Sequence, residues 1–300
     1  MEPSQVLVSV GVPVFNGENY LREALDCLLA QTLDQIEIIL MDNASEDQTP
    51  AIGQSYALKH PKIKYFRQDH NVGAGPNYNA CFKRSKGKFF KWHAHDDLIS
   101  PDFLERCVAL LDKDQNAVLC HSSTRIVDAE GDEIEVYRIS PDCSTSNPAR
   151  RFSNVLLHRG DRLFELYGVI RSYALEQTQL FESHALSDRA LLAQLALQGT
   201  FKRIEEPLFT SRCHPQQSTW RFASAEERSE WIDSSLKGKV TLPEWRAFVD
   251  YERSLLHSGL RWDEKLSSQM QLFRYLKQKK GAMVQDLKSA WKRWTSRLRQ

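Results

Sequence analysis

The order of apolar and polar positions predicts alternating strands and helices along the first 120 residues. Short runs rich in β-branched or aromatic residues, each ended by a turn signal, are typical of buried strands. Between these runs, apolar residues recur every three or four positions, as Leu21, Leu25 and Leu28 do, and predict helices that lie on a sheet. The predicted strands are residues 6–14, 36–41, 62–66, 89–94 and 117–121. Alternation at this spacing favours parallel β-α-β units in an α/β sheet.

The regular alternation ends after the fifth predicted strand. Further elements are a hairpin at residues 126–137, a mobile loop at 142–148, a strand at 163–170, a helix capped by Ser187 and a strand at 201–210. Beyond these elements the pattern is helical. We therefore predict a main domain over residues 1–218 and a helical extension over residues 219–300.

The composition excludes several classes of protein. With 41% hydrophobic residues, 26% charged residues and a formal net charge of +1, the chain is typical of a globular protein and not of one that binds nucleic acid. It has no apolar run of about 18 residues and no basic-then-apolar leader, so we expect a cytoplasmic location. The six cysteines form no CxxC pair, which favours thiols over a disulfide framework or a zinc site.

Two adjacent carboxylates, Asp96 and Asp97, follow the predicted strand at 89–94. Ligands of an open α/β sheet bind beyond the carboxyl ends of its strands. Carboxylates placed there are candidate ligands for Mg²⁺ or Mn²⁺, which often take their remaining ligands from water and substrate phosphates. Taken alone, the pair is equally compatible with a solvated turn.

Four segments in the order VSVGVPVFNGENYL, ILMDNASEDQTP, NVGAGPNYN and FKWHAHDDLISPDFLE together resemble the family 2 glycosyltransferases, which have the GT-A fold. They cover residues 6 to about 125, and a weaker likeness in SDRALLAQLALQG and RCHP extends to about residue 218. The resemblance implies a mostly parallel sheet flanked by helices. It also implies transfer of a sugar from a UDP, GDP or dTDP sugar to an acceptor hydroxyl, usually with inversion and with a divalent metal. The helical extension has no such support.

By this resemblance, the nucleotide sugar contacts the ends of the first two strands, a glycine-containing loop and the acidic turn. The candidate residues are Pro13, Phe15, Asn16, Asp42, Asn43, Gly73, Asn77 and Asp96. Phe15 can stack on a base, and Asp42 can accept a hydrogen bond from a base N–H. Core packing of Phe15, turn capping by Asp42 and a tight turn at Gly73 explain the same residue types without a ligand.

Asp97 matches the metal-binding carboxylate of the family, and Asp188 matches the general base that takes the acceptor proton. The family often has an Asp two positions before the acidic pair, where this chain has Ala94, so His214 becomes a candidate second metal ligand. An acid often precedes the base, where this chain has Ser187. The alternatives are a hydrogen-bonded loop histidine for His214 and a helix-start carboxylate favoured by the helix dipole for Asp188.

We therefore expect an enzyme, namely a metal-dependent hexosyltransferase that acts on a saccharide or lipid-linked acceptor in polysaccharide or glycolipid assembly. Two other classes stay open: a non-catalytic nucleotide-binding or scaffolding module that keeps the fold, and a nucleotidyltransferase. The latter normally carries a glycine-rich loop with a basic residue after its first strand, which VGVPVFNGEN lacks. A dehydrogenase is disfavoured because no GxGxxG follows that strand.

The end of the chain is strongly basic. Residues 271–300 contain nine Lys or Arg and one Asp. In residues 287–300, Trp291, Trp294 and Leu298 fall near one helical face with basic residues elsewhere, which predicts peripheral association with an anionic membrane on its inner face. A solvated or partner-packed terminal helix has the same pattern.

Overall fold

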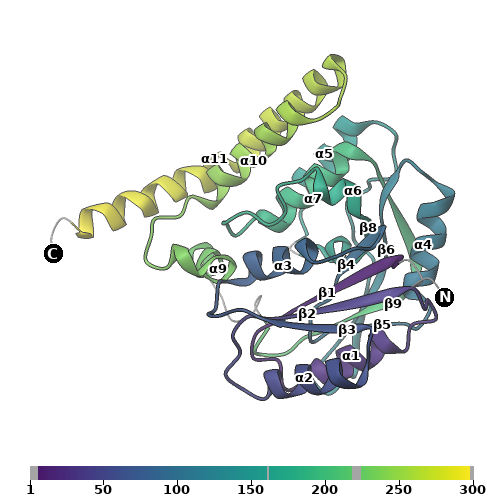
Figure 1. Ribbon diagram of the computed structural model, residues 1–300. Helices are drawn as coiled ribbons and strands as arrows, with labels where there is room; N and C mark the ends of the chain where they lie inside the picture. Colours follow the sequence, from purple (N-terminus) through teal and green to yellow (C-terminus); the bar gives the residue numbers. More distant parts are fainter. Residues whose placement is uncertain (1–5, 161, 218–223, 298–300) are drawn as a thin grey trace.

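A computed structural model describes residues 6–160, 162–217 and 224–297 (Figure 1). Within these residues, one mixed sheet has the strand order β3-β2-β1-β4-β8-β6-β9-β5, and β7 pairs with β6. The strands are β1 (Val8–Val14), β2 (Ile36–Asp42), β3 (Ile63–Arg67), β4 (Phe89–Trp92), β5 (Leu98–Ile99), β6 (Ala117–Val127), β7 (Glu133–Tyr137), β8 (Val169–Arg171) and β9 (Thr200–Arg212). The first four strands are parallel. The predicted α/β class is confirmed.

Helices cover both faces of the sheet. On one face lie α1 (Leu21–Leu29), α2 (Thr49–Lys59) and α4 (Phe103–Lys113), and on the other lie α3 (Ala74–Lys83), α5 (Pro148–Leu156), α6 (Ser172–Glu176) and α7 (Ser187–Gln198). Consecutive side chains of a strand point to opposite faces. Phe89 and Phe90 of β4 therefore enter different cores, and the whole strand is buried. This explains why its sequence is a continuous apolar run interrupted only by Lys91.

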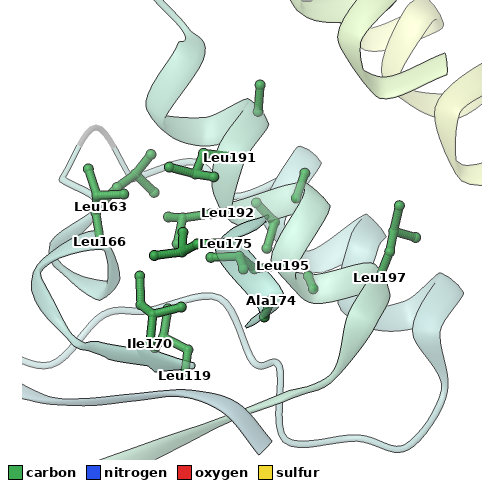
Figure 2. Packing of buried hydrophobic residues seen from close by; sticks show 14 of the residues in the cluster. Leu119, Leu163, Leu166, Ile170, Ala174, Leu175, Leu191, Leu192, Leu195 and Leu197 are labelled. Atoms are coloured by element: carbon green, nitrogen blue, oxygen red, sulfur yellow. The ribbon is translucent and has the colours of Figure 1, made fainter. Parts of the chain in front are cut away.

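The core around α7 is rich in leucine. Leu192 and Leu195 of α7 lie beside Leu175 of α6, and Ile170 of β8 closes the same cluster (Figure 2). The helix is buried on nearly all sides, which accounts for its sequence of apolar residues without a polar face.

The predicted helical C-terminal segment is confirmed. It consists of α9 (Ala225–Ile232), the 3₁₀ turn η2 (Ser234–Leu236), α10 (Pro243–His257) and α11 (Trp262–Arg297). Tyr251 of α10 and Tyr275 of α11 belong to the same hydrophobic cluster as Trp92 of the sheet. The extension thus packs into the main core, and the boundary at residue 218 stays a prediction, since residues 218–223 lie outside the described residues. None of the described helices combines the length and apolar character needed to cross a bilayer.

Two of the elements that differ from the sequence-based expectations lie within residues 148–171. The predicted strand at residues 163–170 is mostly wrong, because the 3₁₀ helix η1 (Phe164–Tyr167) precedes the short β8. Helix α5 was not predicted. The turn-like residues before it act as its start signal, since Asn147 Oδ1 accepts from the Arg150 N–H at 3.1 Å and Pro148 occupies the first turn.

Candidate functional site

Three loops meet at one edge of the sheet. Strands β2, β1 and β4 are parallel neighbours, so the residues that follow them emerge on the same side. A Cβ on Gly17, after β1, would lie 2.5 Å from a ring carbon of His95, after β4. The β1 and β2 loops are joined by the Asn16 N–H, which donates to Ser45 Oγ at 2.9 Å, and by the Gly17 N–H, which donates to Thr49 Oγ1 at 2.8 Å.

The acidic turn lies at this edge and is closed by the end of β9. Asp96 and Asp97 are both buried. His214 Nε2 lies 2.8 Å from Asp96 Oδ2, and Asp97 Oδ1 accepts from the backbone N–H of Arg212 at 3.1 Å. The structure therefore brings together three of the predicted residues. Asp96 and Asp97 are adjacent in sequence, and His214 follows Asp96 by 118 positions.

The two carboxylates differ in their electrostatics. Burial acts to raise the pKa of Asp96, but the neighbouring His95 and the hydrogen bond from His214 outweigh it, so this pKa lies below its usual value. Burial, and then the charge of Asp96, raise the pKa of Asp97 well above its usual value. Asp97 is thus the carboxylate whose ionised form needs a further cation.

Two basic residues at the turn were not assigned from the sequence. Lys91 is fully buried in β4, its Nζ donates to the carbonyl of Tyr167 at 2.6 Å, and burial lowers its pKa to about 7. Arg212 donates through Nη2 to Glu23 at 2.7 Å and lies over the ring of Tyr20 at 4.7 Å. Lys91 could have been found from the sequence, because a lysine inside an apolar strand is unusual. Arg212 could not, because its partners are distant in sequence.

The donor set fits a hard divalent cation that a diphosphate also binds. Asp97 is a buried carboxylate with a raised pKa, and the imidazole of His214 lies nearby. Both groups are suitable ligands for Mn²⁺, whereas Mg²⁺ would accept only the carboxylate. No group of three or more His, Cys, Asp or Glu side chains in the described part of the chain is arranged around a single point. Such a cation would therefore need ligands from a substrate. The metal roles of Asp97 and His214 stay predictions.

The end of β2 holds the predicted residues Asp42 and Asn43 in a protein network. Asp42 is fully buried, and its Oδ2 accepts from the Tyr65 hydroxyl at 2.6 Å and from Arg67 Nη1 at 2.7 Å. Asn43 Nδ2 donates to the carbonyl of Gly73 at 3.1 Å. Asp42 Oδ1 also accepts from the Ser45 N–H at 2.8 Å, so the turn-capping alternative for Asp42 is present in the structure, and a contact with a nucleobase stays a prediction.

The glycine-containing loop is held by the C-terminal segment. Gly73 has a φ of 93°, and a Cβ there would lie 2.6 Å from the carbonyl oxygen of Ile232 and 2.8 Å from the N of Ser234. The backbone that approaches Gly73 closely is thus that of this chain. Asn77 is buried and donates to the carbonyl of Met41 at 2.9 Å, so it fixes α3 to β2.

The β1 end presents the remaining candidates. Pro13 is buried and pairs with Met41, whereas Phe15 is 38% exposed. Asn16 has a φ of 52°, and its Oδ1 accepts from the Glu46 N–H at 2.9 Å. The exposure of Phe15 excludes complete core packing of this ring.

Asp188 lies in the first turn of α7. It is half-buried, its Oδ1 accepts from the Arg189 N–H at 2.7 Å, and burial raises its pKa. His184 is buried and lies just before α7. Its Nε2 is 2.6 Å from Oδ2 of Asp250 in α10, and its Nδ1 accepts a hydrogen bond from the Leu186 N–H at 3.2 Å. The C-terminal helices therefore support the loop that leads to Asp188.

Comparisons with known proteins agree with this geometry. A family model described as glycosyl transferase family 2 matches residues 9–173. An uncharacterized glycosyltransferase of Rickettsia prowazekii is 39% identical over 249 residues, which are 79% of this chain and 74% of the relative. Other curated relatives are much longer than this chain. The matched region spans only 22% to 39% of their lengths.

Solved structures share the fold at low sequence identity. The S. aureus TarS 1–349 in complex with UDP-GlcNAc has a TM-score of 0.66 and 15% identity, with 96% of this chain and 81% of that chain covered. The mannosyltransferase PcManGT from Pyrobaculum calidifontis, in complex with GDP-Man and Mn²⁺, has a TM-score of 0.55 and 14% identity, with 95% and 91% covered. These likenesses show the expected GT-A type of fold.

Proposed function

Because the chain belongs to glycosyltransferase family 2, we propose that it transfers a hexosyl group from a nucleoside diphosphate sugar to an acceptor hydroxyl. The observation that carries the proposal is the buried acidic turn at the edge where β1, β2 and β4 end, with Asp97 short of a cation. The proposal includes inversion at the anomeric carbon and a cytoplasmic location.

The donor binds along this edge in the proposal. Phe15, which is partly exposed, stacks on the base, while the loops that carry Asn16 and Asn43 are pre-organised by their hydrogen bonds. Asp96, oriented by His214, faces the ribose or the sugar. The nucleotides bound by the TarS and PcManGT structures support a UDP or GDP sugar as the donor.

Asp97 would hold Mg²⁺ or Mn²⁺ together with the diphosphate, with His214 as a candidate second ligand. When bound, the cation offsets the negative charge that develops on the departing diphosphate. The protein contributes the burial of Asp97, which excludes water from the carboxylate and strengthens its attraction to a cation. The Mn²⁺ in the PcManGT complex supports this choice of metal.

Asp188 is the proposed general base. Its raised pKa makes it a stronger base than an ordinary Asp, and the Arg189 N–H holds one carboxylate oxygen in place. The other oxygen takes the proton of the acceptor hydroxyl as that hydroxyl attacks the anomeric carbon. We propose a saccharide or lipid-linked saccharide acceptor, in polysaccharide or glycolipid assembly.

A titration tests donor and metal binding together. Calorimetry with UDP, GDP and dTDP sugars, with and without Mn²⁺, should show one nucleotide class that binds more tightly with the metal. Asp97→Asn should abolish this enhancement and lower transfer or donor hydrolysis on the order of 10²- to 10³-fold. The exposed Asp112→Asn is the matched control.

The stability of the same variant separates a chemical role from a structural one. Since burial disfavours the charged form of Asp97, the Asn variant without metal should unfold at the same or higher temperature than the parent chain. Full activity in Asp97→Asn would remove the metal assignment. Donor binding without any transfer would favour the non-catalytic nucleotide-binding alternative.

A further inference from the structure

A row of exposed apolar side chains runs along the outer face of α11. Trp262 is 78% exposed, and Leu266, Met270 and Phe273 are 58%, 53% and 56% exposed. Their spacing of four, four and three residues places them on one helical face. Lys277 and Lys280 follow Phe273 on the same face, and beyond them Val284 and Leu287 extend the row, so that it spans about 38 Å at 1.5 Å per residue.

Helix α10 widens this row into a two-helix face. Val249 and Leu256 of α10 are also exposed. The side chains next to the two rows join the helices, because Gln269 Nε2 donates to Glu252 Oε1 at 2.6 Å and Trp245 Nε1 donates to the carbonyl of Met283 at 3.1 Å. The α10–α11 pair lies on the side of the molecule away from α1 and α2 (Figure 1).

The opposite side of the same helices is already used for packing. Leu272 and Tyr275 of α11 and Tyr251 of α10 are buried in the main core. Both helices are therefore fixed in orientation, and their outer apolar side chains are not misplaced core residues. An apolar face of this extent on a folded protein indicates a binding surface.

The charges along the row are mostly positive, and the exceptions at its start are Asp263, which pairs with Arg261, and Glu264. The exposed ionisable side chains from residue 266 to residue 292 of α11 are Arg274, Lys277, Lys280, Lys288 and Lys292. The one acid in that stretch, Asp286, accepts from the Glu244 N–H at 2.9 Å. A second copy of this face would place like charges opposite each other, whereas an anionic surface would complement them.

We propose that the outer face of α10 and α11 binds the surface of an anionic lipid bilayer. The apolar side chains enter the boundary between head groups and acyl chains, and the lysines beside them contact lipid phosphates. This surface begins 25 residues before the basic tail at residue 287, and it does not depend on the proposed transfer reaction.

Vesicle flotation tests the proposal with the full chain. The protein should bind vesicles of phosphatidylcholine mixed with phosphatidylglycerol and should bind pure phosphatidylcholine much less, with the difference falling at high salt. Leu266→Ser combined with Phe273→Ser should weaken binding at least about tenfold, because both side chains lose their contact with lipid. Lys277→Gln with Lys280→Gln should reduce only the anionic preference.

Matched controls use exposed apolar residues elsewhere. Leu58→Ser on α2 and Ile139→Ser, whose side chains are 89% and 63% exposed, should leave vesicle binding unchanged. Absence of binding to anionic vesicles at low salt would overturn the proposal. So would sedimentation that shows a dimer broken by the Leu266 and Phe273 changes, because the occupant of the face would then be a second copy.

Discussion

At the scale of single residues, neighbouring carboxylates have different surroundings and therefore different chemistry. Asp96 is hydrogen-bonded to His214, while Asp97 receives one backbone hydrogen bond from Arg212 and is destabilised as an anion first by burial and then by the charge of Asp96. A charge that is costly in the isolated protein becomes an attraction when a cation arrives. If Asp97 binds a cation as proposed, the burial that lowers folding stability is the same burial that strengthens cation binding.

Asp188 carries the residue-scale prediction for catalysis. Asp188→Asn should lower kcat on the order of 10²- to 10⁴-fold, since amide cannot take the acceptor proton, and should change the donor Kd less than about twofold. Steady-state kinetics combined with donor titration checks this. Equal losses in kcat and donor affinity would instead indicate that Asp188 only stabilises the start of α7.

Glu165 carries the prediction for pH dependence. It is 2% exposed in η1, its Oε2 has no hydrogen-bond partner among the described residues, and burial raises its pKa from 4.5 to about 7. The unfolded chain releases this proton near pH 4.5 and the folded protein only near pH 7, so folding stability falls as pH rises through this window. Glu165→Gln should remove the fall, which is about 3 kcal/mol at most.

Urea unfolding at pH 5 and pH 8 measures this effect. The variant should gain stability relative to the parent chain at pH 8 and much less at pH 5. The exposed Glu130→Gln should show no such difference. An equal change at both pH values would contradict the assignment to Glu165.

At the scale of elements, α10 is attached to the segment before α7 by the buried pair His184–Asp250 and by two more exposed contacts, Arg246 with the Ser183 carbonyl and Arg253 with Glu182. His184 uses both ring nitrogens, one towards Asp250 and one towards the Leu186 N–H. This arrangement requires Nδ1 to be an acceptor and Nε2 to carry the proton. The position of α7, and of Asp188 within it, therefore depends on a helix of the C-terminal segment.

Asp250→Ala should destabilise the protein by about 1–3 kcal/mol, because it leaves a buried imidazole N–H without its acceptor. Urea unfolding is the measurement. Leu256→Ala on the same helix is the control, since its side chain is 71% exposed. A loss for Asp250→Ala no larger than that of the control would show that the buried pair is not needed to hold α10.

The sequence predicts elements well where the signal is local. The strand at 89–94 and the acidic turn after it are read from adjacent residues, and the turn is where expected. Partners from distant segments are not visible in this way. The bond between His214 and Asp96 and the packing of Ile232 on Gly73 arise only when the chain folds. Helix α5 was missed because its start signal, Asn147 and Pro148, also fits a loop.

At the scale of the whole molecule, the sheet separates two cores, and the C-terminal helices complete one of them. Ala247, Tyr251, Leu255, Leu272 and Tyr275 share that core with α5 and α7. Removal of α10 and α11 would expose the apolar side of α5, including Phe152, whose ring lies 6.1 Å from that of Tyr251. The extension is thus structural as well as a surface for binding.

Two truncations test this view. Deletion of residues 243–300 should give aggregated protein or a sharply lower unfolding temperature, because the core loses its cover. Deletion of residues 287–300 should shift the unfolding temperature by less than about 2 °C, since none of residues 287–292 and 295, whose exposure is described, is buried. Calorimetry measures both. A stable, monomeric product of the larger deletion would show that the core does not need the extension.

The contact between Gly73 and residues 232–234 has an evolutionary consequence. A larger residue at position 73 would have to displace the backbone that leads from α9 to η2. Relatives that lack this C-terminal segment are under no such restriction. Glycine at this position should therefore occur in those family members that have the segment. A larger residue at this position should occur in members that lack it.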